Sequence, residues 1–326
     1  MPSALPVLDL QTATPDEVVD ALIGSSCAFI VGHGVDPELH DRMIEVSRAF
    51  FDLPVERKAE VRWPGDGQWR GWLPVYEGTR DLNGEAPPEL LEKFEIQLSR
   101  PWGRSDAELL ARWGENFDSW PTEPAELRPI WTEYYQEMGF LACRIVTMIV
   151  EALDLPADAL SDWSDHHFAN LVVNNYFGQD TPPMPGQLRA RQHTDIGGLT
   201  LLWADDAPGG LEVRQPGINE WTPVTVPSGA YLIQVGDLLA RWTNDLIKAN
   251  IHRVANPPAS AAAGSRRTSL VYFHYPKLDI TVTPAPSCVG DRQPLGAPIA
   301  AGGHLRKAVH RPKVRQAELA AALGEG

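Results

Sequence analysis

The chain has 326 residues, of which 43% are hydrophobic and 11 are tryptophan, so it can bury one large core. Its formal net charge of −15 argues against nucleic acid or an anionic membrane as the main partner, because both attract basic surfaces. One basic cluster near the C-terminus is interpreted as a solvated tail or helix face: Arg306, Lys307, Arg311, Lys313 and Arg315. These properties predict a soluble protein that works on neither nucleic acid nor membranes.

Helical signals dominate the first half of the chain. The opening segment, MPSALPVLDL, carries neither a basic stretch nor a long apolar run, so we do not expect it to be a signal peptide. Residues Thr14–Glu17 are typical of a helix start, and Asp36–Phe51 shows apolar residues at helical spacing. These patterns predict one helix that begins near Thr14 and a second helix over Asp36–Phe51.

The longest predicted helix runs from about Glu123 to Leu153. Its apolar stripe predicts a scaffold helix that packs against the core, and the stripe consists of Ile130, Trp131, Tyr134, Met138, Leu141, Ile145, Met148 and Ile149. The most apolar window of the chain, Gly139–Leu153, is short and carries Arg144 and Glu151. We therefore expect that it cannot span a bilayer.

After residue 166 the chain becomes a series of short β-rich runs, separated by turn segments such as DDAPGG, QPGINE and PSG. The runs are Asn170–Phe177, Leu188–His193, Gly198–Trp203, Leu211–Gln215, Trp221–Val226, Ala230–Val235, Ile251–Ala255 and Thr268–Tyr275. Short strands at this spacing predict a double-sheet jelly roll. The fold class is therefore mixed α/β, with a jelly-roll core and a helix-rich N-terminal half packed around it.

This change in character divides the chain into three regions. Residues 1–165 form a helix-rich region, residues 166–285 form the jelly-roll core, and residues 286–326 form a segment that packs on or near the core. We expect one integrated domain, because no low-complexity linker separates these regions.

The chain has three cysteines, Cys27, Cys143 and Cys288, which are too few and too far apart for a disulfide framework or a zinc knuckle. Such sparse cysteine usage is typical of a reducing compartment. We therefore expect a cytoplasmic protein, which is a monomer or a small homo-oligomer.

The first chemical signal is the step His193-Thr194-Asp195. In a strand, residues i and i+2 point to the same face, so the imidazole and the carboxylate can reach one ion. About one such step is expected by chance in this composition, but His252 begins the seventh predicted strand, which a folded sheet can return to the same point. Two histidines and one carboxylate leave three positions of an octahedral ion open, which suits Fe(II) that must bind a cosubstrate and O₂. A structural zinc site is closed by four ligands instead.

A second signal is the pair Arg267 and Ser269, which share one face of the eighth strand. A guanidinium with a neighbouring hydroxyl is well shaped to hold a carboxylate. Asn174 and Tyr176 share one face of the first strand and can donate hydrogen bonds to an anion beside the metal. Arg266 precedes Arg267, and a shift of one residue in strand register would exchange the two.

Several motifs, taken in order, resemble the isopenicillin N synthase-like branch of the Fe(II)/2-oxoglutarate oxygenases. They include GGLEV (209–213), PSGAYLIQVGD (227–237), KANIHRV (248–254) and RTS (267–269). In the N-terminal half, LPVLDL and AFIVGHGV (28–35) are similar to the same family. The resemblance extends over most of the chain.

The resemblance implies a double-stranded β-helix core and a role for each candidate residue. It implies Fe(II) as cofactor, with 2-oxoglutarate and O₂ as cosubstrates. His193, Asp195 and His252 would be the iron ligands and the catalytic centre. Arg267 and Ser269 would hold the distal carboxylate of 2-oxoglutarate, with Asn174 and Tyr176 near its keto-acid end; the R-x-S match favours Arg267 over Arg266.

Three classes of function follow from these residues. The leading one is a 2-oxoglutarate-dependent oxygenase that oxidises a C–H bond of a small metabolite by hydroxylation, desaturation or cyclisation, in a biosynthetic pathway. The second is a 2-oxoglutarate-independent iron oxidase of the isopenicillin N synthase type, in which R-x-S binds the substrate. The third is a non-catalytic jelly-roll binding protein, which the intact triad disfavours.

Other polar residues are interpreted mainly as structural. His166 and His167 are expected in a turn, because nothing acidic completes a metal site with them, and His274 lies on the strand face opposite Arg267 and Ser269. The resemblance places five residues near a substrate pocket, although packing explains each of them as well: Arg70, Trp72, Tyr76, Glu95 and Gln97.

Overall fold

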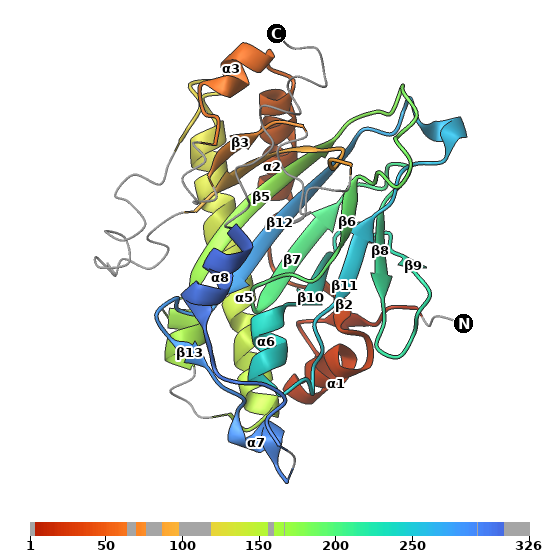
Figure 1. Cartoon of the computed structure of the whole chain (residues 1–326). Coiled ribbons are helices and arrows are strands. Elements are labelled where there is room, and N and C mark those ends of the chain that lie inside the picture. The colour runs from red at the N-terminus through yellow and green to blue at the C-terminus, as the bar shows by residue number, and fades with distance from the viewer. Residues whose placement is uncertain are drawn as a thin grey trace.

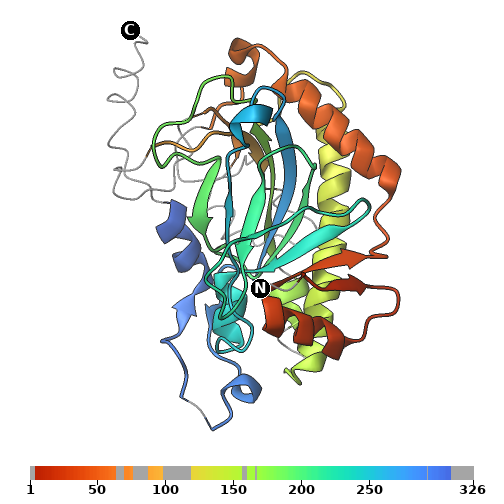
Figure 2. The same ribbon diagram turned by 90° about the vertical axis from the view of Figure 1, so that its right-hand side faces the viewer.

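The computed structural model describes residues 4–63, 70–75, 87–97, 119–155, 160–165, 167–291 and 293–309. Two sheets form the centre of the molecule, and the long helix α5 runs along the outer side of the larger one (Figure 1). The view turned by 90° shows α2 and α5 together on that side (Figure 2). The opposite face of the larger sheet is turned toward the smaller sheet.

The larger sheet has eight strands in the order β1-β2-β10-β7-β12-β5-β4-β3. These strands are β1 (Val7–Asp9), β2 (Cys27–Val31), β10 (Tyr231–Val235), β7 (Leu199–Ala204), β12 (Arg267–Tyr275), β5 (Phe168–Tyr176), β4 (Glu92–Ile96) and β3 (Gly71–Leu73). The N-terminal half thus contributes both edges of this sheet, which the sequence did not predict. The strand CAFIV of β2 is apolar throughout, and such a run cannot be told from a buried helix by periodicity.

The smaller sheet has the order β6-β11-β8-β9. Its strands are β6 (Ala190–His193), β11 (Ile251–Val254), β8 (Leu211–Arg214) and β9 (Thr222–Pro223). Each of the predicted β-rich runs overlaps one strand, although β9 is much shorter than its predicted run. Four of the eight core strands lie in each sheet, and the predicted jelly roll is confirmed.

The helices begin at residues that satisfy their free N–H groups. In α1 (Pro15–Ser25), the backbone N–H of Glu17 donates to Thr14 Oγ1, and the Thr14 N–H donates to the Glu17 carboxylate at 2.8 Å. Asp36 caps α2 (Pro37–Phe51) by accepting from Glu38 N. The scaffold helix α5 (Leu127–Ala152) buries Trp131, Tyr134, Tyr135, Met138 and further apolar residues of the predicted stripe.

Shorter elements complete the described chain. They are α3 (Val55–Ala59), a π-helical turn η1 (Ser161–Asp165), α6 (Asp237–Trp242), a 3₁₀ turn η2 (Ala259–Ala261), β13 (Thr281–Val282), α7 (Pro286–Val289), β14 (Ile299–Ala300) and α8 (Ala301–Val309). No helix in these described parts has the length and apolarity needed to cross a membrane. Arg306 and Lys307 lie in α8, whereas residues 311–315 of the predicted basic cluster fall outside the described residues.

Apolar side chains fill two separate volumes. The larger cluster lies between the helices and the outer face of the larger sheet. The smaller cluster lies between the two sheets and includes Phe29, Leu232, Val213, Val224 and Val226. Apolar packing therefore occupies one end of the barrel interior, and polar side chains gather at the other end.

A buried carboxylate ties the N-terminal half to the barrel. Glu92 is 1% exposed, and its Oε2 lies 2.8 Å from Lys58 Nζ and accepts a 2.7 Å hydrogen bond from Trp72 Nε1. Its Oε1 accepts a 2.9 Å hydrogen bond from Asn175 Nδ2. The network joins α3, β3, β4 and β5, so it fixes the strand that borders the polar end of the barrel. A buried, charged carboxylate destabilises the fold when it loses its cation and its hydrogen-bond donors.

We expect the substitution Lys58→Met to lower the free energy of unfolding by about 3–5 kcal/mol, because it leaves Glu92 buried without its cation. Chemical denaturation measures this change. The matched control is Arg57→Met, which removes an exposed pair with Glu60 (2.7 Å) and should cost only about 0–1 kcal/mol. Equal losses in the two variants would show that the buried network does not stabilise the fold.

Candidate metal centre

Three predicted residues converge at the polar end of the barrel. His193 ends β6 and is the direct cross-strand partner of His252 in β11, with ring centroids 4.1 Å apart. Asp195 Oδ1 lies 3.6 Å from His193 Nε2 and 3.7 Å from His252 Nε2. Asp195 is not in the strand, as the i, i+2 argument assumed, but in the turn that follows it. The three ligand atoms nevertheless surround a single point, and their residues form a group that can hold a metal ion.

Backbone carbonyls orient both imidazoles. His193 Nδ1 lies 2.6 Å from the carbonyl oxygen of Arg191, and His252 Nδ1 lies 3.3 Å from that of Asn250. A carbonyl can only accept, so each Nδ1 carries the proton and donates. Each Nε2 then directs its lone pair toward Asp195 Oδ1, which is the arrangement of a metal-binding histidine.

Asp195 is held from two directions. The Thr200 hydroxyl donates to Asp195 Oδ2 at 2.7 Å, which leaves Oδ1 facing the two imidazoles. The backbone N–H of Asp237, at the start of α6, donates to the Asp195 carbonyl at 2.7 Å. Two imidazoles and one carboxylate on one side of an ion fit Fe(II) with open positions, so the donor set suits an oxygenase iron.

A cavity between the two sheets contains this centre. Its wall includes Asn174, Tyr176, Thr200, Gln234, Ser269 and Phe273 from the larger sheet, and His193, His252 and Val254 from the smaller one. Apolar residues such as Leu202 and Leu211 complete the wall. The centre therefore faces a partly apolar space between the sheets, where a small molecule can meet the metal.

The second predicted group lies on two paired strands. In the β12–β5 ladder, Arg267 is opposite Tyr176, and Ser269 is opposite Asn174. Asn174 Nδ2 donates to Ser269 Oγ at 3.1 Å, and the Arg267 guanidinium carbon lies 5.6 Å from the Tyr176 ring centre. Arg267 is 3% exposed. Arg266 points outward instead, with Nη1 lying 2.6 Å from a carboxylate oxygen of Asp52.

The positively charged Arg267 guanidinium is buried with few partners that offset the cost of its burial. Its Nε has no hydrogen-bond partner within the described chain, and Asp205 Oδ1 is 4.0 Å away. Asp205 is already engaged by Arg48 Nη2 at 2.9 Å and by the backbone N–H of Thr268 at 2.7 Å. Burial lowers the pKa of Arg267, and Tyr176 and Asp205 oppose this effect. A buried cation in this state favours an anionic ligand.

Arg189 is a second buried cation that the sequence did not single out. It donates to the backbone carbonyls of Pro208 (2.9 Å), Phe177 (3.1 Å) and Ser265. Burial, followed by the nearby charge of Arg267, lowers the pKa of Arg189 to about 10. Arg189 lies in a predicted strand, where nothing local distinguishes it from a surface arginine. Two guanidinium groups therefore share this end of the barrel.

The predicted pocket residues separate onto two faces. Trp72 donates to Glu92 on the helix side of the sheet and does not reach the cavity. Lys93 does line the cavity, beside Asn174, and its Nζ lies 2.9 Å from Glu95 Oε1. The sequence analysis missed Lys93, although alternation along EKFEI places it on the same face as Glu95. Tyr76 lies outside the described residues.

Comparisons with known proteins agree with this geometry. The profile of the 2OG-Fe(II) oxygenase superfamily matches residues 168–276, and that of the non-haem dioxygenase in morphine synthesis N-terminal region matches residues 5–123. Validamycin A dioxygenase of Streptomyces hygroscopicus subsp. limoneus is 32% identical over 304 residues, which are 89% of this chain and 82% of the relative.

Solved structures show the same architecture. The structure of JOX2 in complex with 2OG, Fe and JA has a TM-score of 0.73 and 27% identity, covering 92% of this chain and 83% of that chain. A 2OG-Fe(II) oxygenase family protein from Caulobacter crescentus, at 24% identity, has a TM-score of 0.79 over 94% of this chain and 98% of its own, which supports the fold alone.

The chain therefore belongs to the 2OG-Fe(II) oxygenase superfamily. It is a 2-oxoglutarate-dependent dioxygenase that acts on a small metabolite, with Fe(II) as cofactor and with 2-oxoglutarate and O₂ as cosubstrates. The expected family and its cofactors are thus confirmed.

Because Thr200 holds the Asp195 carboxylate in place, we expect Thr200→Val to weaken Fe(II) binding by about 10- to 100-fold. Thr200→Ser keeps the hydroxyl and should bind Fe(II) almost as the unmodified protein does. Anaerobic Fe(II) titration measures both affinities. Normal affinity in the valine variant would mean that the hydroxyl does not orient the ligand.

Proposed function

We propose that His193, Asp195 and His252 hold the catalytic Fe(II). The convergence of two Nε2 atoms on Asp195 Oδ1, at 3.6 and 3.7 Å, carries this assignment. The orientation of both rings by backbone carbonyls supports it, because an imidazole with its proton on Nδ1 presents the Nε2 lone pair that binds a metal. Among the described residues, this is the metal-ligating group that faces the cavity.

We further propose that Arg267 and Ser269 bind the distal carboxylate of 2-oxoglutarate. The proposal is supported by the burial of Arg267 and by its Nε–H, which donates to no acceptor within the described chain. A planar guanidinium matches a carboxylate through paired N–H donors. Asn174 and Tyr176, which line the same cavity wall, would bind near the keto-acid end.

Bound iron and 2-oxoglutarate supply the oxidising chemistry: for a hydroxylation, C–H plus 2-oxoglutarate plus O₂ gives C–OH plus succinate plus CO₂. The residues of this chain bind, orient and exclude water. Arg267 fixes one end of the cosubstrate, Thr200 fixes the Asp195 carboxylate, and apolar residues such as Leu202 and Val271 limit the water around the reacting atoms.

We infer that the substrate is a small metabolite of a biosynthetic pathway that presents polar groups to the cavity. Glu89, Lys93 and Gln234 line the wall, and these charged and polar side chains favour a substrate that carries polar groups of its own over a neutral hydrocarbon. The outcome at the C–H bond is hydroxylation, desaturation or cyclisation. A net charge of −15 supports a small molecule, and not nucleic acid, as the substrate.

We also propose the division of the chain into residues 1–165, 166–285 and 286–326, with the iron centre in the second region. The separate matches of residues 5–123 and 168–276 to two profiles support this division.

We propose a reducing cytoplasmic setting, which the three free cysteines support. The proposed assembly is a monomer or a small homo-oligomer.

The substitution Arg267→Ala should raise the KM for 2-oxoglutarate by at least about 30-fold, equivalent to about 2 kcal/mol, because a buried carboxylate loses its charged partner. Arg266→Ala is the matched control, because Arg266 points outward to Asp52, and its KM should change little. Steady-state kinetics at varied 2-oxoglutarate measures both values. The reverse ranking would transfer the role to Arg266.

Turnover of the true substrate should release succinate and product in a one-to-one ratio and should stop when 2-oxoglutarate is withheld. The reason is that the buried cations around Arg267 require a small anion. Quantifying succinate and product in the same reaction tests the proposal. Product formed with Fe(II) and O₂ alone would place the protein with the 2-oxoglutarate-independent oxidases, with Arg267 binding the substrate instead.

A further inference from the structure

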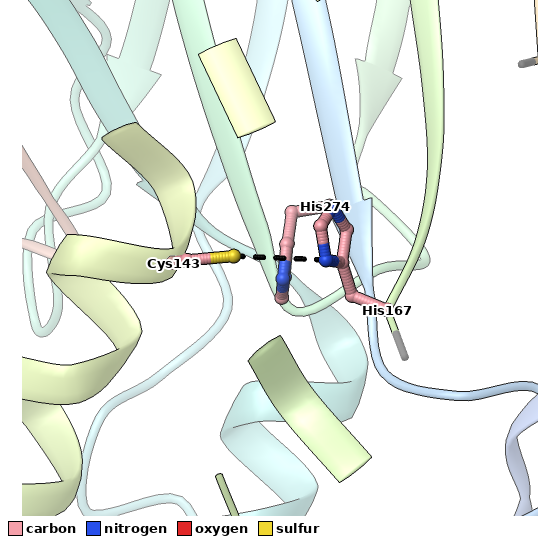
Figure 3. Close-up of side chains that lie close together, drawn as sticks. All are labelled: Cys143, His167 and His274. Carbon is pink, nitrogen blue, oxygen red and sulfur yellow. Dashed lines mark hydrogen bonds between the residues drawn. The ribbon is translucent and has the colours of Figure 1, made fainter. Parts of the chain in front are cut away.

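A second cluster of metal-ligating side chains lies on the helix side of the larger sheet, away from the cavity. Cys143 comes from α5, His167 immediately precedes β5, and His274 comes from β12, and the three side chains point toward one another (Figure 3). One ligand atom from each residue lies within 4.8 Å of the other two. The sequence predicted a turn position for His167, and the fold brings this residue against the long helix.

His274 is the member of the cluster that points to a ligand. Its side chain is fully buried, and among the described residues the backbone carbonyl of Trp163 is the one hydrogen-bond partner near its ring nitrogens. Its ring stacks on the ring of His167, with centroids 4.8 Å apart and 27° between the planes. Stacking satisfies neither ring nitrogen, and the Trp163 carbonyl can engage only one of them, so the other is buried without a partner in the described chain. A buried polar group in this state is destabilising.

The spacing of the other two donors fits a shared ion. Cys143 Sγ lies 3.6 Å from His167 Nδ1. Zinc binds thiolate sulfur at about 2.3 Å and imidazole nitrogen at about 2.0–2.1 Å, so at a tetrahedral angle the two donors lie roughly 3.5 Å apart. The side chains therefore need little movement to reach one ion.

His167 can adopt the protonation state that such a site requires. Its Nδ1 lies 2.7 Å from the Ser164 carbonyl oxygen, and its Nε2 lies 3.2 Å from the Tyr272 hydroxyl. A carbonyl can only accept, so without a metal Nδ1 carries the ring proton and donates to the Ser164 oxygen. Metal binding at Nδ1 requires this proton to move to Nε2, from which the ring can donate to the Tyr272 oxygen. A hydrogen bond from the second ring nitrogen is the usual support of a metal-binding histidine.

Burial sets the charge states of the three groups. It raises the pKa of the Cys143 thiol to about 11 and lowers the pKa of His167. Burial also lowers the pKa of His274 well below its ordinary value; the neighbouring His167 lowers it further, and the Trp163 carbonyl opposes this. Both imidazoles are therefore neutral at neutral pH, so only the thiol proton has to leave when a metal binds.

We propose that Cys143, His167 and His274 form a second metal site, which binds a thiophilic divalent ion of the zinc class, with water at the fourth position. On binding, the S–H bond of Cys143 breaks, a sulfur–metal bond forms, and one proton is released per ion. Cys143 is partly exposed, which gives the ion a path of entry. The bound ion cross-links α5 to β12 and does not depend on the iron centre.

The test uses the full-length chain with His193→Ala and His252→Ala, which remove the competing iron ligands. Anaerobic titration with Co²⁺ should produce a thiolate-to-cobalt charge-transfer band in the near ultraviolet, saturating at about one ion per chain, and Zn²⁺ should abolish the band. Adding Cys143→Ser should remove the band. Adding Cys288→Ser, which changes a buried cysteine outside the cluster, should leave the band intact.

A second measurement leaves all three proposed ligands unchanged. In the same variant background, saturating Zn²⁺ should slow alkylation of Cys143 by at least about 10-fold, measured by peptide mass spectrometry, because a metal-bound thiolate does not react freely. It should also raise the Tm, through binding to the folded state alone. The absence of a thiolate band, a band that survives Cys143→Ser, or alkylation that Zn²⁺ does not slow would each overturn the proposal.

Discussion

The pairing of β11 with β6 is the constraint on which the rest of the site depends. It sets His252 directly opposite His193, although the two are far apart in the chain. A shift of one residue would turn one imidazole out of the cavity. The turn after β6 then brings in Asp195, whose backbone is held by α6 and whose carboxylate is held by Thr200. The candidate metal centre is thus built from strand register and two hydrogen bonds, so it forms only when both sheets are in place.

The barrel interior combines this centre with buried positive charge. Arg267 and Arg189 lie at the same end, and the carboxylate of Asp205, 4.0 Å from Arg267, is shared with Arg48. Among the described residues, neither cation has a carboxylate closer than the 4.0 Å between Arg267 and Asp205, in contrast to the Lys58–Glu92 pair at 2.8 Å outside the barrel. The difference has a physical reason. In a structural ion pair the charge of the cation is balanced by a carboxylate of the same chain, whereas in a binding site the cation keeps unbalanced charge that a ligand can neutralise.

The N-terminal half does more than cover the barrel. Through β4 it extends the larger sheet beside β5, and the alternation of that strand carries Lys93 into the cavity and Phe94 into the helix-side core. The network of Glu92 holds this strand to α3 and β3. On the helix side, Cys143 and His274 meet in the same way, because α5 packs across β12. Each face of the larger sheet therefore carries its own cluster of side chains that can hold a metal ion.

The sequence by itself determined the core strands, the longest helices, the iron ligands as candidates, and the inward face shared by Arg267 and Ser269. These features depend on alternation and periodicity over a few residues, which any folded context preserves. Only the tertiary structure decided that Asp195 lies beyond the end of β6, that Arg189 is buried beside Arg267, and that His167 and His274 lie against Cys143. Those contacts join segments that are remote along the chain. Because they depend on how helices and strands pack together, they produce no pattern in the local sequence.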